Sequence, residues 1–295
     1  MAFTLLVDSA RRPIPQAVLE RSTGICIAYG GSRDNLQALL GATGGGEILL
    51  RIQDPSTLPP DGFVVYQDGI YYVWIAGTTN PDQMLGQIRG DLSTPAVPVL
   101  GQTNSFWVDI ARRVSPYVAV AIQERESARS GLPTPVNAFG ISLPSPAVVP
   151  TLRIEFIGDS YGSAVALILA IAYAERYGED NVRACLFGAP KVVLERYAGP
   201  APGVLIRPHR NADPVPYLPP TAGVRMSVKA EEGEPDVGVF LQWAHLGSGW
   251  LIGDDGLLSM DPYDTRVSWL AVGVFTAFAV KEHLYRNVAA ILSRM

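Results

Sequence analysis

A serine flanked by glycines lies near the middle of the chain, in the segment Gly158-Asp159-Ser160-Tyr161-Gly162. The G-x-S-x-G spacing is typical of a nucleophile elbow, in which the serine stands on a turn too tight for side chains on both flanks. An apolar run over 152–157 predicts a strand before the turn, and another over 163–177 predicts a helix after it. Ser160 is therefore a candidate nucleophile. Because the chain has 29 glycines, a purely structural glycine turn is the alternative.

A serine nucleophile needs a base, and the base needs a carboxylate that orients it. The chain has three histidines, His209, His245 and His283. Asp213 follows Ser160 in a proline-fixed loop just past a predicted strand end, as the order serine, acid, histidine of α/β-hydrolases requires. The later two histidines follow Asp213 and are candidate bases, whereas His209 precedes it and is predicted to be a loop residue.

The elements around these residues alternate between strand and helix, which indicates an α/β fold with a central, mostly parallel sheet flanked by helices. Strands are predicted over 25–29, 63–66, 70–76, 152–157, 182–187 and 204–206. Helices are predicted over 32–40, over 106–129 with an interruption at Pro116, and over 163–177. The third helix is apolar almost all round, so it must be buried. Asp68-Gly69 is a strong hairpin signal between two of the strands.

Residues 1–295 are predicted to form one domain, since no repeat or clear linker divides them. The segment 132–150 contains five prolines and is predicted to be a long loop. Such a loop either covers a binding site or is a surface insertion.

The composition excludes several classes of partner and cofactor. Hydrophobic residues make up 48% of the chain, so a large core is available and general disorder is excluded. The net charge of -5 offers no attraction to nucleic acid. The separated histidines and two cysteines have no metal-ligand spacing, so neither a metal nor a cofactor is predicted. Cys26 and Cys185 lie in apolar runs and are predicted to be buried free thiols.

The N-terminal segment does not resemble a signal peptide, and the longest apolar stretches are shorter than the ~20 residues of a membrane-spanning helix. No transmembrane segment is therefore predicted, and a cytoplasmic location is weakly favoured.

Four segments resemble, in the same order, those of the class 3 lipases, the family of fungal triacylglycerol lipases within the α/β-hydrolases. They are a hairpin and turn at 63–80, the serine segment at 154–170, C-L-F-G-A-P-K-V at 185–192 and R-N-A-D-P-V-P-Y-L-P-P at 210–220. The last is the most specific, because it matches the family's acid loop at almost every position.

The resemblance implies a role for each matching residue. Ser160 would be the nucleophile, Asp213 the acid, and His283, within a segment similar to the family's D-H-x-x-Y, the base. His245 lies in a segment similar to one whose histidine is not the family's base, so it is held in reserve. The oxyanion hole would consist of the backbone N–H groups of Thr78 and Tyr161.

Three departures from the family pattern affect the site. Asp159 replaces a histidine, and it is either a solvated turn residue or a charge that perturbs the local field. Tyr161 replaces a leucine, which would narrow the acyl pocket or donate a hydrogen bond. Ala76 replaces an arginine. The segment 79–90, which corresponds to the family's lid, is either a short amphipathic lid or a connecting helix.

These features together predict a serine carboxylic-ester hydrolase, a lipase or esterase acting on a small-molecule ester or lipid with transient contact to a lipid interface. A phospholipase A1 or an acyltransferase on the same triad is the alternative. A non-catalytic hydrolase-like binding protein is the alternative from another functional class.

Overall fold

A computed structural model describes residues 37, 45–52, 62–77, 96–97, 103–127, 136–138, 140–145, 152–194, 197–209, 213, 215–217, 224–228, 237–241, 243–252 and 258–260. The predictions for 25–29, 32–40, Cys26, Thr78, the segment 79–90 and His283 concern residues outside this part, residue 37 excepted.

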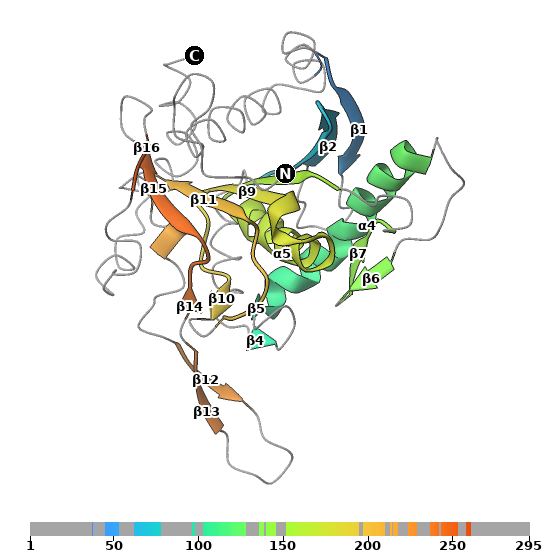
Figure 1. The fold of residues 1–295 in the computed structure, drawn as a ribbon. Helices are drawn as coiled ribbons and strands as arrows, with labels where there is room; N and C mark the ends of the chain where they lie inside the picture. Colours follow the sequence, from blue (N-terminus) through green and yellow to red (C-terminus); the bar gives the residue numbers. More distant parts are fainter. Residues whose placement is uncertain are drawn as a thin grey trace.

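An eight-stranded sheet forms the centre of the fold (Figure 1). In spatial order its strands are β1 (Glu47–Ile52), β2 (Gly62–Gln67), β3 (Ile70–Ile75), β8 (Ile154–Asp159), β9 (Val182–Phe187), β11 (Val204–His209), β15 (Ser248–Ile252) and β16 (Leu258–Met260). The five strands from β3 to β15 run parallel, and the flanking pairs are antiparallel. The carboxyl ends of β3, β8, β9, β11 and β15 therefore meet at one edge.

Two long helices pack beside the sheet (Figure 1). The helix α5 (Tyr161–Tyr177) lies against β8 and β9, and α4 (Ser105–Ser127) lies against α5 and β1. The first fourteen residues of α5 are buried, which confirms the prediction of a buried helix after Ser160. Its apolar side chains form one core cluster with those of α4 and the sheet.

The helix α4 runs without a break through Pro116, so the predicted interruption is wrong. Proline has no N–H to donate to the carbonyl of Arg112, four residues earlier. The Ser115 hydroxyl donates to that carbonyl at 3.2 Å instead and also accepts the backbone N–H of Ser142 at 2.9 Å. Pro116 is exposed, so its ring lies on the outer side of the helix. A side-chain hydroxyl therefore replaces the missing backbone donor.

The proline-rich segment 132–150 contains a hairpin, so it is not a loop throughout. Its strands are β6 (Val136–Ala138) and β7 (Ile141–Leu143), and the turn passes through Gly140 at φ +80°. The strand β7 packs against α4, and Tyr177 donates a hydrogen bond to the Pro144 carbonyl. Because Tyr177 ends α5, this contact lies about 25 Å along the helix from Ser160.

The predicted β2–β3 hairpin is confirmed, and its turn residues Asp68 and Gly69 both have positive φ, as a type I′ turn requires. The strand β11 is three residues longer than predicted. His209 is its last residue and is buried, so the prediction of a loop residue is wrong. The reason is pairing with β15, which places His209 opposite Leu251.

Smaller elements surround the main sheet. One is a four-stranded sheet of β14 (Trp243–Ala244), β10 (Val193–Leu194), β5 (Thr103–Asn104) and β4 (Ala96–Val97). Another is the pair of β12 (Val224–Val228) and β13 (Val237–Leu241). Short 3-10 helices cover Glu179–Asn181 (η1) and Val215–Tyr217 (η2).

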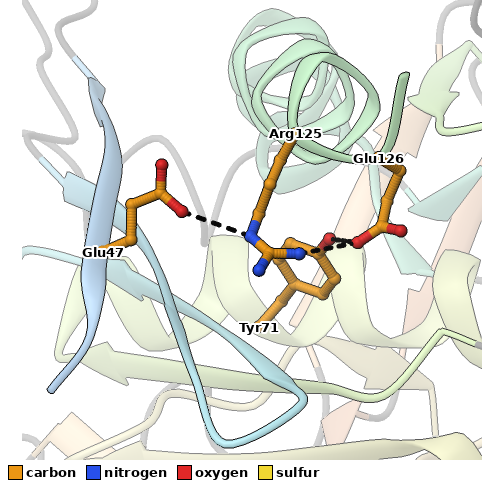
Figure 2. Close-up of polar contacts among 4 residues, drawn as sticks. All are labelled: Glu47, Tyr71, Arg125 and Glu126. Atoms are coloured by element: carbon orange, nitrogen blue, oxygen red, sulfur yellow. Dashed lines mark hydrogen bonds and ion pairs between the residues drawn. The ribbon is translucent and has the colours of Figure 1, made fainter. Parts of the chain in front are cut away.

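A polar cluster ties α4 to the antiparallel side of the sheet (Figure 2). Arg125 donates to Glu126 at 2.9 Å and to Glu47 at 3.3 Å, and its guanidinium lies 3.2 Å from the ring centroid of Tyr66. The Tyr71 hydroxyl donates to Glu126, and burial, followed by this hydrogen bond, raises the tyrosine pKa. Because Tyr71 stands near the start of β3, the cluster lies away from the edge that carries Ser160.

Candidate active site

Ser160 occupies a strained turn between β8 and α5. Its backbone has φ 53° and ψ -118°, a conformation that costs a residue with a Cβ about 1–3 kcal/mol. Its N–H donates to the Phe187 carbonyl at 2.8 Å, and the Ser163 hydroxyl donates to the same carbonyl at 2.8 Å. These hydrogen bonds hold the turn against the end of β9. Strain of this kind is concentrated at functional sites, which favours a nucleophile over a structural glycine turn.

The two glycines of the motif lie where no side chain would fit. A Cβ at Gly158 would stand 2.5 Å from the Ser163 Cα, and a Cβ at Gly162 would stand 2.2 Å from the Ile75 carbonyl oxygen. Both obstacles are backbone atoms, which cannot rotate away. The spacing G-x-S-x-G therefore follows from the close approach of β3, β8 and α5 around the serine.

The end of β3 lies directly beside the elbow. A Cβ at Gly77 would stand 3.1 Å from the Cβ of Ser160 and 2.9 Å from a carboxylate oxygen of Asp159. Thr78, the first predicted oxyanion donor, follows Gly77 but lies outside the described residues. The Asp159 side chain is only partly exposed, and its charge stands next to the strand end that leads to this donor.

Tyr161, whose N–H is the second predicted oxyanion donor, is the first residue of α5. The N–H of Tyr161, at the first position of the helix, has no acceptor within the helix. The Tyr161 side chain is buried, and its ring meets the Trp107 ring edge-on, with centroids 4.9 Å apart. The ring therefore belongs to the core between α4 and α5.

Asp213 lies four residues beyond the end of β11 and is fully buried. One of its carboxylate oxygens accepts the backbone N–H of Val215 at 3.0 Å, which fixes the side chain within its own turn. One strand, β9, separates β11 from β8, so the two strand ends are about 10 Å apart. The sheet thus brings the strand ends that precede Ser160 and Asp213 to the same edge.

His245 lies before β15, with its Nε2 atom 2.5 Å from the carbonyl oxygen of Pro216. Burial lowers the pKa of its imidazole well below the usual value, and the positive charges of Arg207 and Lys191 lower it further. Because a carbonyl only accepts hydrogen bonds, Nε2 must carry a proton here. His245 therefore engages the backbone of the acid loop through the nitrogen that a base would need free.

Sequence reasoning missed the buried cations beside this loop. Arg207 and Lys191 are 1% and 3% exposed, and Arg207 donates to the carbonyls of Leu246 and Gly247. The available signal for Arg207 was its place directly after the apolar run 204–206, where a charged residue is rarely buried unless it is paired.

Within the described ranges, no three His, Cys, Asp or Glu side chains are placed to hold a metal ion. The helices of the same ranges are all too short or too polar to cross a membrane. Cys185 is a buried free thiol, as predicted.

A parallel sheet with a strained serine between a central strand and a buried helix defines the α/β-hydrolase class. The family model for lipase (class 3) matches residues 72–223, more than half of the 295 residues. The chain therefore belongs to the class 3 lipase family and is a lipase-type carboxylic ester hydrolase. A search of curated proteins finds no match.

Solved lipases share the fold at low sequence identity. The triacylglyceride lipase of Rhizomucor miehei is 16% identical, with a TM-score of 0.58 over 94% of this chain and 94% of that one. Lipase II of Rhizopus niveus is 16% identical, with a TM-score of 0.57 over 92% of this chain and 91% of that one. A third neighbour, 18% identical with a TM-score of 0.55 over 91% and 90%, is a triacylglycerol lipase whose catalytic centre is a serine protease triad.

Proposed function

We propose that this lipase cleaves acyl esters through Ser160, Asp213 and His283, with an acyl-enzyme intermediate. The observation that carries the proposal is the strained backbone of Ser160 on a turn that excludes side chains on either flank. The buried Asp213 at the same sheet edge supports it. His283 is assigned by its place after both residues and by its resemblance to the family's base segment.

In the proposed mechanism, the imidazole of His283 takes the Ser160 hydroxyl proton as Oγ bonds to the ester carbonyl carbon. The negative charge that develops on the carbonyl oxygen is stabilised by the N–H groups of Thr78 and Tyr161, at roughly 3 kcal/mol for each donor. The imidazolium returns the proton to the leaving alkoxide as the C–O bond breaks. Water then hydrolyses the acyl-enzyme by the same route. Asp213 orients the imidazole throughout.

The substrate we propose is a neutral ester or lipid, met in transient contact with a lipid interface. The family membership supports this choice. Hydrolysis of p-nitrophenyl esters of increasing chain length, beside triacylglycerol and phospholipid emulsions, tests it. Fatty acid release from the sn-1 position of phospholipid alone identifies a phospholipase A1, and acyl transfer to an alcohol in place of water identifies an acyltransferase.

The nucleophile is tested with Ser160→Ala and with Ser142→Ala as the matched control on β7. The Ser160→Ala variant is expected to lose both ester hydrolysis and labelling by a fluorophosphonate, while the control keeps both. Labelling of Ser160→Ala at the wild-type rate would show that another residue is the nucleophile. Ester binding without turnover by the wild-type chain would favour a non-catalytic binding protein.

A further inference from the structure

The segment that precedes β15 is tied to β11 by one side chain and to the acid loop by another. Arg207 of β11 donates from Nε to the Leu246 carbonyl at 2.9 Å and from Nη2 to the Gly247 carbonyl at 3.2 Å. In the other direction, His245 reaches from this segment to the Pro216 carbonyl at 2.5 Å. These contacts connect residues that are 29, 39 and 40 positions apart in the sequence.

Pro216 is coupled to the carboxylate of Asp213 through a very short stretch of chain. It follows Val215, whose N–H is the donor to the Asp213 carboxylate at 3.0 Å, and both residues belong to η2. A shift of the Pro216 peptide therefore moves the Val215 N–H and with it the direction of the carboxylate. Since His245 holds the Pro216 carbonyl, its imidazole acts on the acid through one turn of backbone.

The groups around His245 keep its imidazole neutral, as its hydrogen bond to the Pro216 carbonyl requires. Burial and the charges of Arg207 and Lys191, with a smaller effect from His209, lower the imidazole pKa, whereas the hydrogen bond to Pro216 raises it. The ring is therefore neutral at physiological pH. A neutral imidazole has one N–H, and the carbonyl acceptor fixes it at Nε2.

We propose that His245 is a positioning residue for the triad acid: its Nε2–H holds the Pro216 carbonyl and so sets the direction in which Asp213 presents its carboxylate to the base. This inference rests on the proposed function, because it requires Asp213 to orient a catalytic imidazole. It also gives His245 a role other than that of the catalytic base.

The proposal predicts an effect on the pH profile that a loss of stability alone would not produce. A carboxylate beside an imidazole raises the imidazole pKa. When the acid is turned away, the pKa of the base falls, so the acid limb of the activity profile moves to lower pH. A displacement of about 1 Å also slows catalysis by up to about 100-fold.

The test measures the rate of fluorophosphonate labelling of Ser160 from pH 4 to 9 in the full chain. Two variants separate the nitrogen positions: the amide nitrogen of His245→Gln reaches the place of Nε2, and that of His245→Asn does not. We expect His245→Asn to label more slowly with its acid limb at lower pH, and His245→Gln to stay close to the wild type. Tyr177→Phe removes the side-chain hydrogen bond to the Pro144 carbonyl far from the site and should leave the profile unchanged.

Several results would overturn the proposal. One is a His245→Asn variant whose labelling rate and acid limb equal those of the wild type. Another is a His245→Gln variant that loses as much labelling rate as His245→Asn does. If His245→Asn does not fold, the ¹⁵N shifts of the wild-type imidazoles decide, since a His245 that titrates near pH 6.5 or carries its proton on Nδ1 contradicts the contact. A wild-type chain that is never labelled rejects the proposed function itself, and with it the triad that His245 would position.

Discussion

At Ser160, the strained backbone conformation and the proposed role as nucleophile depend on the same turn. Ser160 has positive φ, and Asp68 in a hairpin turn is the other non-glycine residue with positive φ in the described part of the chain. The Ser160 strain persists because the Phe187 carbonyl holds the turn from β9. The turn lifts the hydroxyl to the sheet edge and leaves the first N–H groups of α5 beside it.

Substituting Gly162 with alanine should damage both stability and activity. The new Cβ would stand 2.2 Å from the Ile75 carbonyl oxygen, so β3 and α5 must move apart. We expect a loss of about 1–3 kcal/mol in unfolding free energy, as for other overpacked sites, with a fall in kcat because the elbow moves. Urea denaturation and ester hydrolysis measure the two effects.

Gly45→Ala is the control for Gly162→Ala. Gly45, unlike Gly162, has positive φ, and it has open space around its Cβ position, so its alanine variant should lose only the conformational cost and keep its activity. Equal behaviour of the two variants would show that the crowding around Gly162 is not what holds the elbow.

Substituting Asp213 with asparagine should abolish most of the activity without unfolding the chain. The amide oxygen can still accept the Val215 N–H, so the buried turn keeps its hydrogen bond. The amide cannot stabilise an imidazolium, and the expected loss in kcat is about 10⁴-fold. Steady-state kinetics together with a circular dichroism melt measure this. Activity within tenfold of the wild type would remove Asp213 from the triad.

At the scale of elements, α4 depends on one hydroxyl at its proline. Ser115 bonds both the Arg112 carbonyl and the Ser142 N–H, so Ser115→Ala leaves two backbone groups without that partner. We expect a destabilisation of about 1–3 kcal/mol, since Ser115 is fully buried. The kcat should stay unchanged, because the hairpin that shares this hydroxyl packs on α4 away from Ser160.

Thermal unfolding of Ser115→Ala and Ser115→Thr checks that prediction. Threonine keeps the hydroxyl and should recover part of the lost stability, although its extra methyl group enters a buried site. A Ser115→Ala variant as stable as the wild type would mean that the two backbone groups find other partners.

At the scale of the whole molecule, His245 makes stability depend on pH. Its pKa is lowered in the folded chain, so below about pH 6.5 the unfolded chain binds a proton that the folded chain does not. The free energy of unfolding therefore falls with acid, by at most about 1.4 kcal/mol per pH unit for this one group. His245→Gln should flatten this dependence between pH 4.5 and 6.5. Urea midpoints at several pH values test it, and parallel curves for both chains would contradict it.

Much of the fold and part of the site could be predicted without the structure. The β2–β3 hairpin, the buried helix α5 and the serine turn all follow from short-range patterns. The failures share one cause, which is a contact with a distant residue. The hydroxyl of Ser115 rescues the helix at Pro116, and pairing with β15 extends β11 through His209.

The sequence by itself determined the features that depend on neighbouring residues: the elbow glycines, the turn at Asp68 and the apolar surface of α5. These follow from backbone sterics and from side-chain periodicity, which act within a few residues. Only the tertiary structure decided that Gly77, Ser160 and Asp213 share one sheet edge and that His245 holds Pro216. Such contacts join residues tens of positions apart, and they exist only once the order of the strands has been set by packing of the whole core.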